Sequence, residues 1–200
     1  MTKSKKTVFN ISLALGLVSA ILISMAPFAD ACNDMYENIV RIRVIANSNS
    51  ETDQTVKLLV RDRLLESSKE LFSPCKSEEE AVTVAENNLS LFKREADALL
   101  SEENFGYEAK AELRREFFPT REYDGFTLPA GEYDTLVVTL GDGGGENWWC
   151  VMFPQVCVGA CSGRLTDTVA ENSAEYAKNA DKYILKFKVV EIFGRIRKKF

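Results

Sequence analysis

The sequence predicts an α+β fold, with one small mainly antiparallel or mixed sheet and helices packed on one face, in a single domain. Three observations predict it. The chain has 200 residues, which is enough for one domain with a core and short for two. The segments after residue 31 follow the order β-α-α-β-β-β-α. No internal repeat or low-complexity block interrupts that order.

The first 31 residues have the pattern of a secretory signal peptide. Three lysines within the first six residues precede an apolar run over about residues 8–28. Ala29-Asp30-Ala31 is an A-x-A cleavage pattern just before Cys32. The apolar run is nearly long enough to cross a bilayer, so an uncleaved membrane anchor is the alternative. We expect a signal peptide over residues 1–31 and one domain over residues 32–200.

The first half of the domain predicts a strand and two helices. In the segment 39–46, the residues at positions 40, 42, 44 and 46 are all apolar and lie on one side, which indicates a strand with one apolar face. Ser50 is a good N-cap for a helix that we expect to end near Glu70. Ser77 and Glu80 form a capping box for a second helix, which we expect to continue to about residue 100.

The second half predicts three further strands. Residues 107–117 alternate between apolar and charged side chains, as a half-buried strand does. Residues 134–141 are rich in β-branched side chains, which favours a central strand. The run Gly143-Gly144-Gly145 predicts a tight loop with positive φ angles. Residues 148–153 then form a further strand or extended segment.

The closing segment, residues 183–200, is predicted to be a basic amphipathic helix. We expect it to dock on the sheet of its own domain, and contact with an anionic membrane surface is the alternative. Its apolar positions are Leu185, Val189, Ile192, Phe193 and Ile196.

The composition argues against several kinds of chemistry. The chain contains no histidine, which removes the most common general base and metal ligand. Removal of residues 1–31 takes away three lysines and Asp30 and leaves a net charge of −7, which disfavours nucleic acid as a partner. Glu146 follows the glycine run where a phosphate loop needs a lysine. We therefore expect no enzyme activity, no metal, no cofactor and no small-molecule substrate.

The five cysteines suit an oxidising compartment. An export signal places the chain where disulfides persist. Cys150 and Cys157 flank a short loop that contains Pro154, and we expect a disulfide between them. The alternative is a bridge from Cys75 to Cys157 or Cys161. Because the number of cysteines is odd, at least one is free, lipidated or paired between chains.

Four side chains are candidates for partner binding. Neighbouring residues of a strand face opposite sides, so Trp148 and Trp149 cannot both enter the same core. An exposed tryptophan is a favoured anchor at interfaces, and burial of both rings is the alternative. Arg41 and Arg43 lie on one side of their strand, where they form either a solvated face or a recognition stripe. We expect Arg41, Arg43, Trp148 and Trp149 to contact a partner.

Three stretches of the chain are similar to a known family. They are residues 42–62, 128–157 and 187–193, and they include the motifs RVIANS (43–48) and NWWCV (147–151). With these motifs, the chain resembles the stage II sporulation protein R family of endospore-forming Firmicutes. The resemblance spans most of the domain, but it assigns no contact residue position by position.

The resemblance implies a signalling function. Proteins of that family are made in the forespore and exported into the space between forespore and mother cell. There they trigger a membrane-embedded aspartic protease, stage II sporulation protein GA, which then processes pro-sigma-E. The resemblance thus implies a signal whose partner is that protease. The alternatives are an exported carboxylate-dependent hydrolase and a structural envelope protein held in the membrane by residues 8–28.

Overall fold

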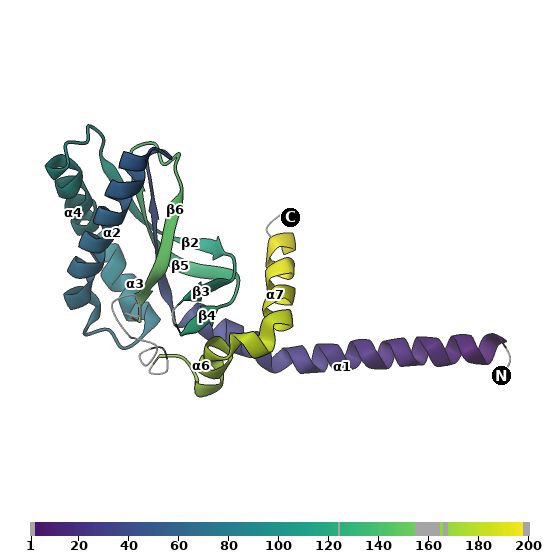
Figure 1. The fold of residues 1–200 in the computed structure, drawn as a ribbon. Helices are drawn as coiled ribbons and strands as arrows, with labels where there is room; N and C mark the ends of the chain where they lie inside the picture. Colours follow the sequence, from purple (N-terminus) through teal and green to yellow (C-terminus); the bar gives the residue numbers. More distant parts are fainter. Residues whose placement is uncertain (1–2, 124, 155–164, 166–167, 198–200) are drawn as a thin grey trace.

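The structure is a computed structural model that describes residues 3–123, 125–154, 165 and 168–197 (Figure 1). Its elements, in chain order, are α1 (Lys3–Glu37), β1 (Val40–Ile45), α2 (Glu51–Phe72), α3 (Glu78–Asn87), α4 (Leu89–Glu102), β2 (Ala109–Phe118), β3 (Arg121–Tyr123), β4 (Phe126–Leu128), β5 (Gly131–Leu140), β6 (Asn147–Phe153), α6 (Glu171–Lys178), the 3-10 helix η1 (Ala180–Tyr183) and α7 (Ile184–Arg197).

A mixed four-stranded sheet lies at the centre of the domain, in the order β2-β5-β1-β6 (Figure 1). β1 pairs in parallel with β5 and antiparallel with β6, and β2 pairs antiparallel with β5. The expected α+β class is therefore confirmed. The expectation of a central strand over residues 134–141 is also confirmed, because β5 lies between β1 and β2.

Three helices, α2, α3 and α4, cover one face of the sheet (Figure 1). Val40, Ile42 and Val44 of β1 point into this core and are fully buried, as their alternation predicts. The predicted second helix is two helices, because the chain leaves helical geometry at Asn88. The Asn88 side chain donates a hydrogen bond to the carbonyl of Val84 (2.8 Å), and such local bonds compete with the helical ladder.

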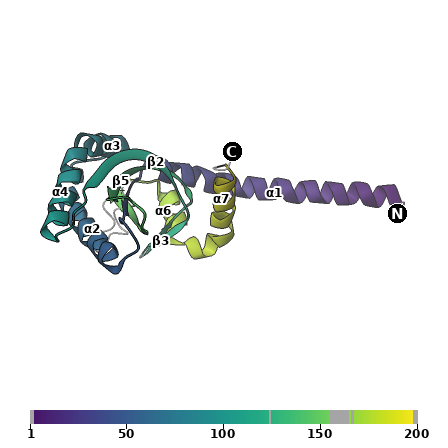
Figure 2. The ribbon, with the colours of Figure 1, turned by 90° about the horizontal axis from the view of Figure 1, so that it is seen from above.

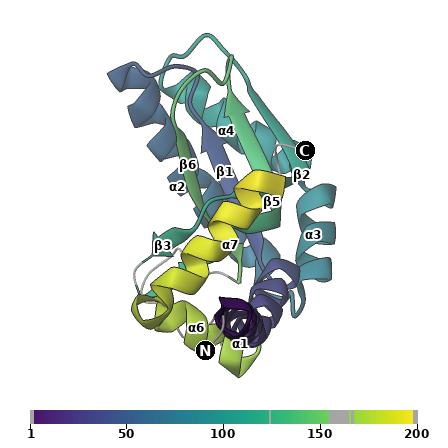
Figure 3. The ribbon, with the colours of Figure 1, turned by 90° about the vertical axis from the view of Figure 1, so that its right-hand side faces the viewer.

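The described residues cover the opposite face of the sheet at one end only. There the end of α1, the small β3–β4 hairpin and α6 enclose a second apolar cluster (Figures 1 and 3). The hairpin was not predicted, because its two strands have only three residues each. The buried members of this cluster are Met35, Ile39, Phe118, Phe126, Leu128, Tyr133, Val151, Leu165, Val169, Ala174 and Ala177.

Helix α1 is continuous over 35 residues and extends far out of the domain (Figures 1 and 2). Its stretch Thr7–Glu37 is long and apolar enough to cross a membrane, a test that a signal sequence near an N-terminus also passes. Its large apolar side chains from Val8 to Ile23 are exposed, whereas Phe28 and Cys32 are buried in the domain. An apolar helix of this kind is compatible with either export or anchoring.

Helix α7 confirms the predicted closing helix, but the docking face is a different one. Phe187 and Glu191 are buried against the domain, with Val190 and Gly194 half-buried beside them. The apolar residues expected to dock are all exposed instead: Leu185, Val189, Ile192, Phe193 and Ile196. Their spacing indicated a helix correctly, but it could not show that the helix carries a second, shorter docking stripe.

Candidate functional site

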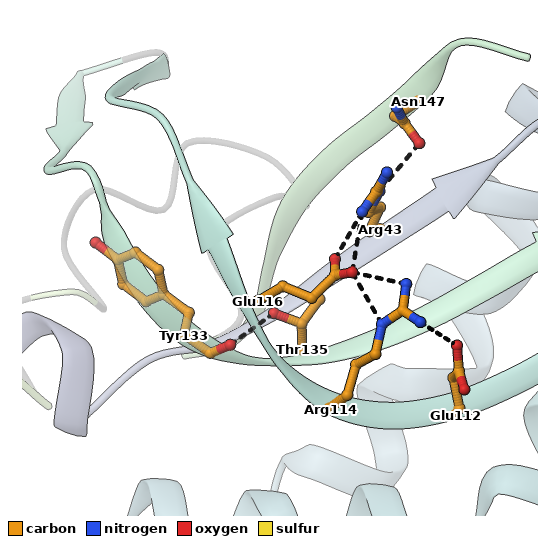
Figure 4. A network of polar contacts seen from close by, with 7 residues as sticks. All are labelled: Arg43, Glu112, Arg114, Glu116, Tyr133, Thr135 and Asn147. Atoms are coloured by element: carbon orange, nitrogen blue, oxygen red, sulfur yellow. Dashed lines mark hydrogen bonds and ion pairs between the residues drawn. The ribbon is translucent and has the colours of Figure 1, made fainter. Parts of the chain in front are cut away.

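The part of the second sheet face that the hairpin leaves uncovered carries a network of charged side chains (Figure 4). Arg43 of β1 donates from Nε to Asn147 Oδ1 (3.0 Å) and from Nη1 to both oxygens of Glu116 (3.0 and 2.9 Å). Arg114 donates from Nε to Glu116 Oε1 (2.9 Å) and from Nη1 to Glu112 Oε1 (2.6 Å). We call these five residues, together with Trp149, the polar sheet face.

The network fixes side chains from three strands in one arrangement. Glu116 lies at its centre with 14% of its side chain exposed, and its partners Arg43 and Arg114 are 25% and 44% exposed. Charge-assisted bonds of a partly buried carboxylate to two guanidinium groups are stronger and more directional than neutral ones. Both carboxylates of the network, Glu112 and Glu116, are paired with arginine. The polar sheet face is thus a rigid, charge-balanced surface.

Trp149 lies at the border between the polar sheet face and the apolar end of the sheet. Its half-buried ring meets the edge of Phe118 (5.1 Å between centroids). The exposed guanidinium of Arg121, from β3, lies 4.2 Å from the indole centroid, and that of Arg43 lies 5.7 Å away. Planar cations close to an indole face are attracted by its quadrupole. The unpredicted hairpin therefore adds Arg121 to this site.

Trp148 lies on the other side of the sheet, as the alternation of strand residues predicts. It packs against the main core below α2, and the guanidinium of Arg61 lies 5.2 Å from its ring. Both tryptophans are only partly exposed. The structure brings Trp149 and Arg43 together and separates Trp148 from them.

Arg41 has no access to solvent, so its expected role as a contact residue needs correction. Its guanidinium lies 3.9 Å from the ring centroid of Phe118 and 5.0 Å from that of Tyr133. It also donates hydrogen bonds to the hydroxyl of Tyr123 and, at 3.5 Å, to the carbonyl of Cys150. Burial lowers the pKa of Arg41, and the neighbouring tyrosines oppose that shift. The alternation of β1 identified its side of the sheet, but the hairpin covers that side at Arg41.

The RVIANS motif and the glycine run form two loops that bind each other at the far end of β1. Gly144 N donates to the carbonyl of Asn47 and Gly145 N to that of Ala46, both at 2.9 Å. The Asn47 side chain accepts from Asp142 N (2.9 Å). A Cβ on Gly145 would overlap the Ser48 backbone, which explains why glycine is needed there. Within the glycine run, the expected positive φ angle is confirmed for Gly143 (66°) but not for Gly144 or Gly145, and Gly141, just before the run, has one as well (55°).

Asp53, in the first turn of α2, stabilises this pair of loops. Its buried carboxylate accepts hydrogen bonds from Ser48 Oγ (2.5 Å), Asn47 Nδ2 (3.1 Å) and the Tyr107 hydroxyl (2.5 Å). Burial alone would raise the pKa of Asp53, but these donors lower it below its ordinary value. The sequence indicated only that Asp53 suits the first turn of a helix. The partner Tyr107, far away in sequence, could not be inferred.

The cysteines are partly described. Cys150 is buried on β6, whereas Cys157 and Cys161 lie outside the described residues, so the expected disulfide between Cys150 and Cys157 stays a prediction. Cys75 is a free thiol, which excludes the alternative bridges to it in this structure. Cys32 is also free and is buried.

Comparisons with known proteins agree with these motifs. The family model for stage II sporulation protein R matches residues 36–162, which include the whole sheet. Stage II sporulation protein R of Bacillus subtilis (strain 168) is 33% identical over 159 residues, which cover 76% of this chain and 71% of that protein. No solved structure matches. The chain belongs to the stage II sporulation protein R family.

Proposed function

We propose that this protein is an exported signal of sporulation that triggers the membrane aspartic protease stage II sporulation protein GA to process pro-sigma-E. It acts in the space between forespore and mother cell. Membership of the family and the apolar N-terminal helix, which is compatible with export or anchoring, support this proposal.

One observation assigns the proposed contact with the protease to a particular surface. The two specific motifs of the chain lie on neighbouring strands, with Arg43 directly opposite Trp149 in the antiparallel pairing of β1 and β6. Their side chains meet on the polar sheet face, with the Arg43 guanidinium 5.7 Å from the indole centroid, outside the helix-covered core. Tryptophan and arginine are the residue types that most often dominate binding energy at interfaces. The protease therefore contacts the polar sheet face around Trp149, Arg43 and Arg121.

The experiment is co-expression with the protease and pro-sigma-E in a host that does not sporulate, with processing followed by immunoblot. If this protein leaves processing unchanged, the proposal fails. Substitution of Arg121 by alanine tests the surface, because this side chain is exposed and lies over the ring of Trp149. Loss of an interface anchor worth about 1–2 kcal/mol lowers the apparent affinity by roughly 5- to 30-fold.

Arg61→Ala is the matched control for Arg121→Ala. Each arginine lies over one ring of the tryptophan pair, Arg61 over Trp148 on the helix side and Arg121 over Trp149 on the polar sheet face. We expect normal processing with Arg61→Ala and reduced processing with Arg121→Ala, at equal thermal stability. Equal processing by the two variants would remove the polar sheet face from the proposal without removing the signalling function.

A second candidate function is a structural envelope protein held by α1. The exposed apolar side chains between Val8 and Ile23 favour it, because they are suited to a lipid environment. Permanent retention in the membrane fraction, together with unchanged pro-sigma-E processing, would support it. The polar sheet face gives a hydrolase no such support, since its two carboxylates, Glu112 and Glu116, are both ion-paired with arginine.

A further inference from the structure

Helix α7 is apolar on two opposite sides. One side docks on the domain: Phe187 meets the ring of Phe28 edge-on at 4.9 Å, and Gly194 lies against the ring of Phe117. The other side forms an outer stripe of five apolar residues at positions i, i+4, i+7, i+8 and i+11, which share one helix face. The stripe consists of Leu185 (81% exposed), Val189 (37%), Ile192 (56%), Phe193 (68%) and Ile196 (48%).

Basic residues border the outer stripe on both sides. With about 100° of rotation per residue, Lys188 and Arg195 lie along one border, and Lys186 and Arg197 lie along the other. The acidic residue of the helix, Glu191, is buried on the docking side, where Lys188 (3.4 Å) and Arg195 (2.5 Å) bind it. The outward surface of α7 is therefore an apolar stripe between two basic edges.

The position of α7 relates this surface to α1. Lys186 Nζ donates a hydrogen bond to the carbonyl of Ser24 (2.9 Å), directly after the exposed apolar part of α1 ends at Ile23. The stretch from Val8 to Ile23 is about 24 Å long as a helix, close to the roughly 30 Å of a hydrocarbon core. Contact with α7 thus occurs at the level where a membrane-inserted α1 would leave the bilayer.

The orientation of α7 fits that level. Helix α7 runs across α1 rather than along it, on the side of the domain from which α1 extends (Figures 1 and 3). A helix that crosses a membrane-spanning helix at this point lies along the membrane surface. Apolar side chains then reach the acyl boundary, and the exposed side chains of Lys188, Arg195 and Arg197 extend toward the headgroups.

We infer that the outer stripe of α7 binds the surface of an anionic lipid bilayer. A second copy of the chain would also cover the apolar residues, but it would bring its own basic borders, so that the exposed charges of Lys188, Arg195 and Arg197 in the two copies would repel each other. Anionic headgroups on both sides of an embedded helix would instead attract these charges. The inference does not depend on the proposed signalling function, and α7 lies beyond residues 36–162 of the family match.

The test uses the full chain in nanodiscs of phosphatidylcholine, with or without phosphatidylglycerol. Phe193→Trp places a fluorescent reporter on the outer stripe, and the emission of the parent chain is subtracted. Leu59→Trp is the matched control, because Leu59 is an exposed apolar residue (39%) on α2 at the opposite side of the sheet. We expect brominated lipids to quench the reporter at position 193 strongly, and more so with phosphatidylglycerol, while the reporter at position 59 is not quenched.

A charge variant tests the basic borders. Arg197→Gln in the Phe193→Trp chain should lower the ratio of docked to undocked helix by about fivefold in anionic nanodiscs, the effect of one basic residue near such a surface. Lys76→Gln, a change on the opposite side of the domain, should leave that ratio unchanged. Two results would overturn the inference: equal quenching of the reporters at positions 193 and 59, or shielding of the reporter at position 193 that depends on protein concentration instead of lipid.

Discussion

The contact between the two motif loops predicts that Gly145 and Gly106 respond oppositely to alanine. A Cβ on Gly145 would lie 2.2 Å from the backbone carbonyl oxygen of Ser48, whereas a Cβ on Gly106 would meet nothing within 4 Å. Neither glycine has a positive φ, so both backbones accept alanine. The two variants therefore differ only in the space around the added methyl group.

The magnitude for Gly145→Ala follows from the hydrogen bonds that the methyl group displaces. To restore a contact of 3.4 Å with this oxygen, the loops must separate by about 1.2 Å. The bonds from Gly144 N to Asn47 O and from Gly145 N to Ala46 O, each 2.9 Å long, would then exceed 3.5 Å. Two such bonds contribute about 1–3 kcal/mol to the free energy of unfolding. Alanine returns about 0.4–1 kcal/mol by restricting the unfolded chain.

The assay is thermal unfolding of the full chain in nanodiscs, followed by circular dichroism. A net loss of about 1–2 kcal/mol lowers Tm by roughly 2–8 °C in a domain of this size. Gly106→Ala should leave Tm unchanged or raise it slightly. If the two variants melt at the same temperature, the reasoning about the loop contact is wrong.

Three further predictions concern two carboxyl groups and one pair of cysteines. Asp53→Asn should lower the free energy of unfolding by about 2–3 kcal/mol at pH 7, because charged acceptors make the stronger hydrogen bonds. The pKa of Asp53 is lowered in the folded protein, so its carboxylate loses this advantage as the pH falls through that pKa. Acid-unfolding curves of the parent and the variant should therefore converge over that range. Burial and the nearby carboxyl of Asp134 raise the pKa of Glu78 to about 7. The parent should therefore lose stability as the pH rises from about 4.5 to 7, whereas Glu78→Gln should not. Melting curves of both proteins at pH 5 and pH 8 measure this difference. Secreted protein should yield a linked peptide of Cys150 and Cys157 by mass spectrometry, and free thiols at both positions would contradict it.

Alternation within a strand predicted which residues share a side, but not what covers that side. It placed Arg41 and Arg43 on one face and the two tryptophans on opposite faces, and both assignments are correct. Whether Arg41 meets solvent depends on β3 and β4, whose three-residue strands are too short to leave a periodic signal. The burial of Arg41 could therefore not be predicted from the alternation of residues in β1.

The remaining parts of the site depend on long-range pairing. Glu116 on β2 and Arg43 on β1 come together because both strands pair with β5, which lies between them. The parallel pairing of β1 with β5 joins segments that are about 90 residues apart. Arg121 reaches Trp149 only after the hairpin folds back over the sheet. No local sequence pattern indicates either contact. The sequence therefore identified two members of the polar sheet face, Arg43 and Trp149, and missed the others.

The position of the predicted cleavage site gives a final prediction about the N-terminus. The bond between Ala31 and Cys32 lies inside α1, and the two residues are 1% and 2% exposed. Proteases prefer exposed and flexible backbone, so cleavage must precede the docking of this helix. Phe28, which packs on Phe187 and Tyr176, would be lost with the leader, and loss of a buried phenylalanine costs about 3–5 kcal/mol.

Docking of Phe28 should therefore compete with cleavage. We expect the intact chain to predominate when the protein is made in a host with signal peptidase, and Phe28→Ala to increase the fraction that begins at Cys32. Intact-mass spectrometry of the membrane and medium fractions measures both forms. Ile23→Ala is the control, because Ile23 is an apolar residue of the same helix whose side chain is 74% exposed and takes no part in docking. Complete cleavage of the parent chain would show that the leader is removed before α1 can dock, and the domain would then have to fold without Phe28.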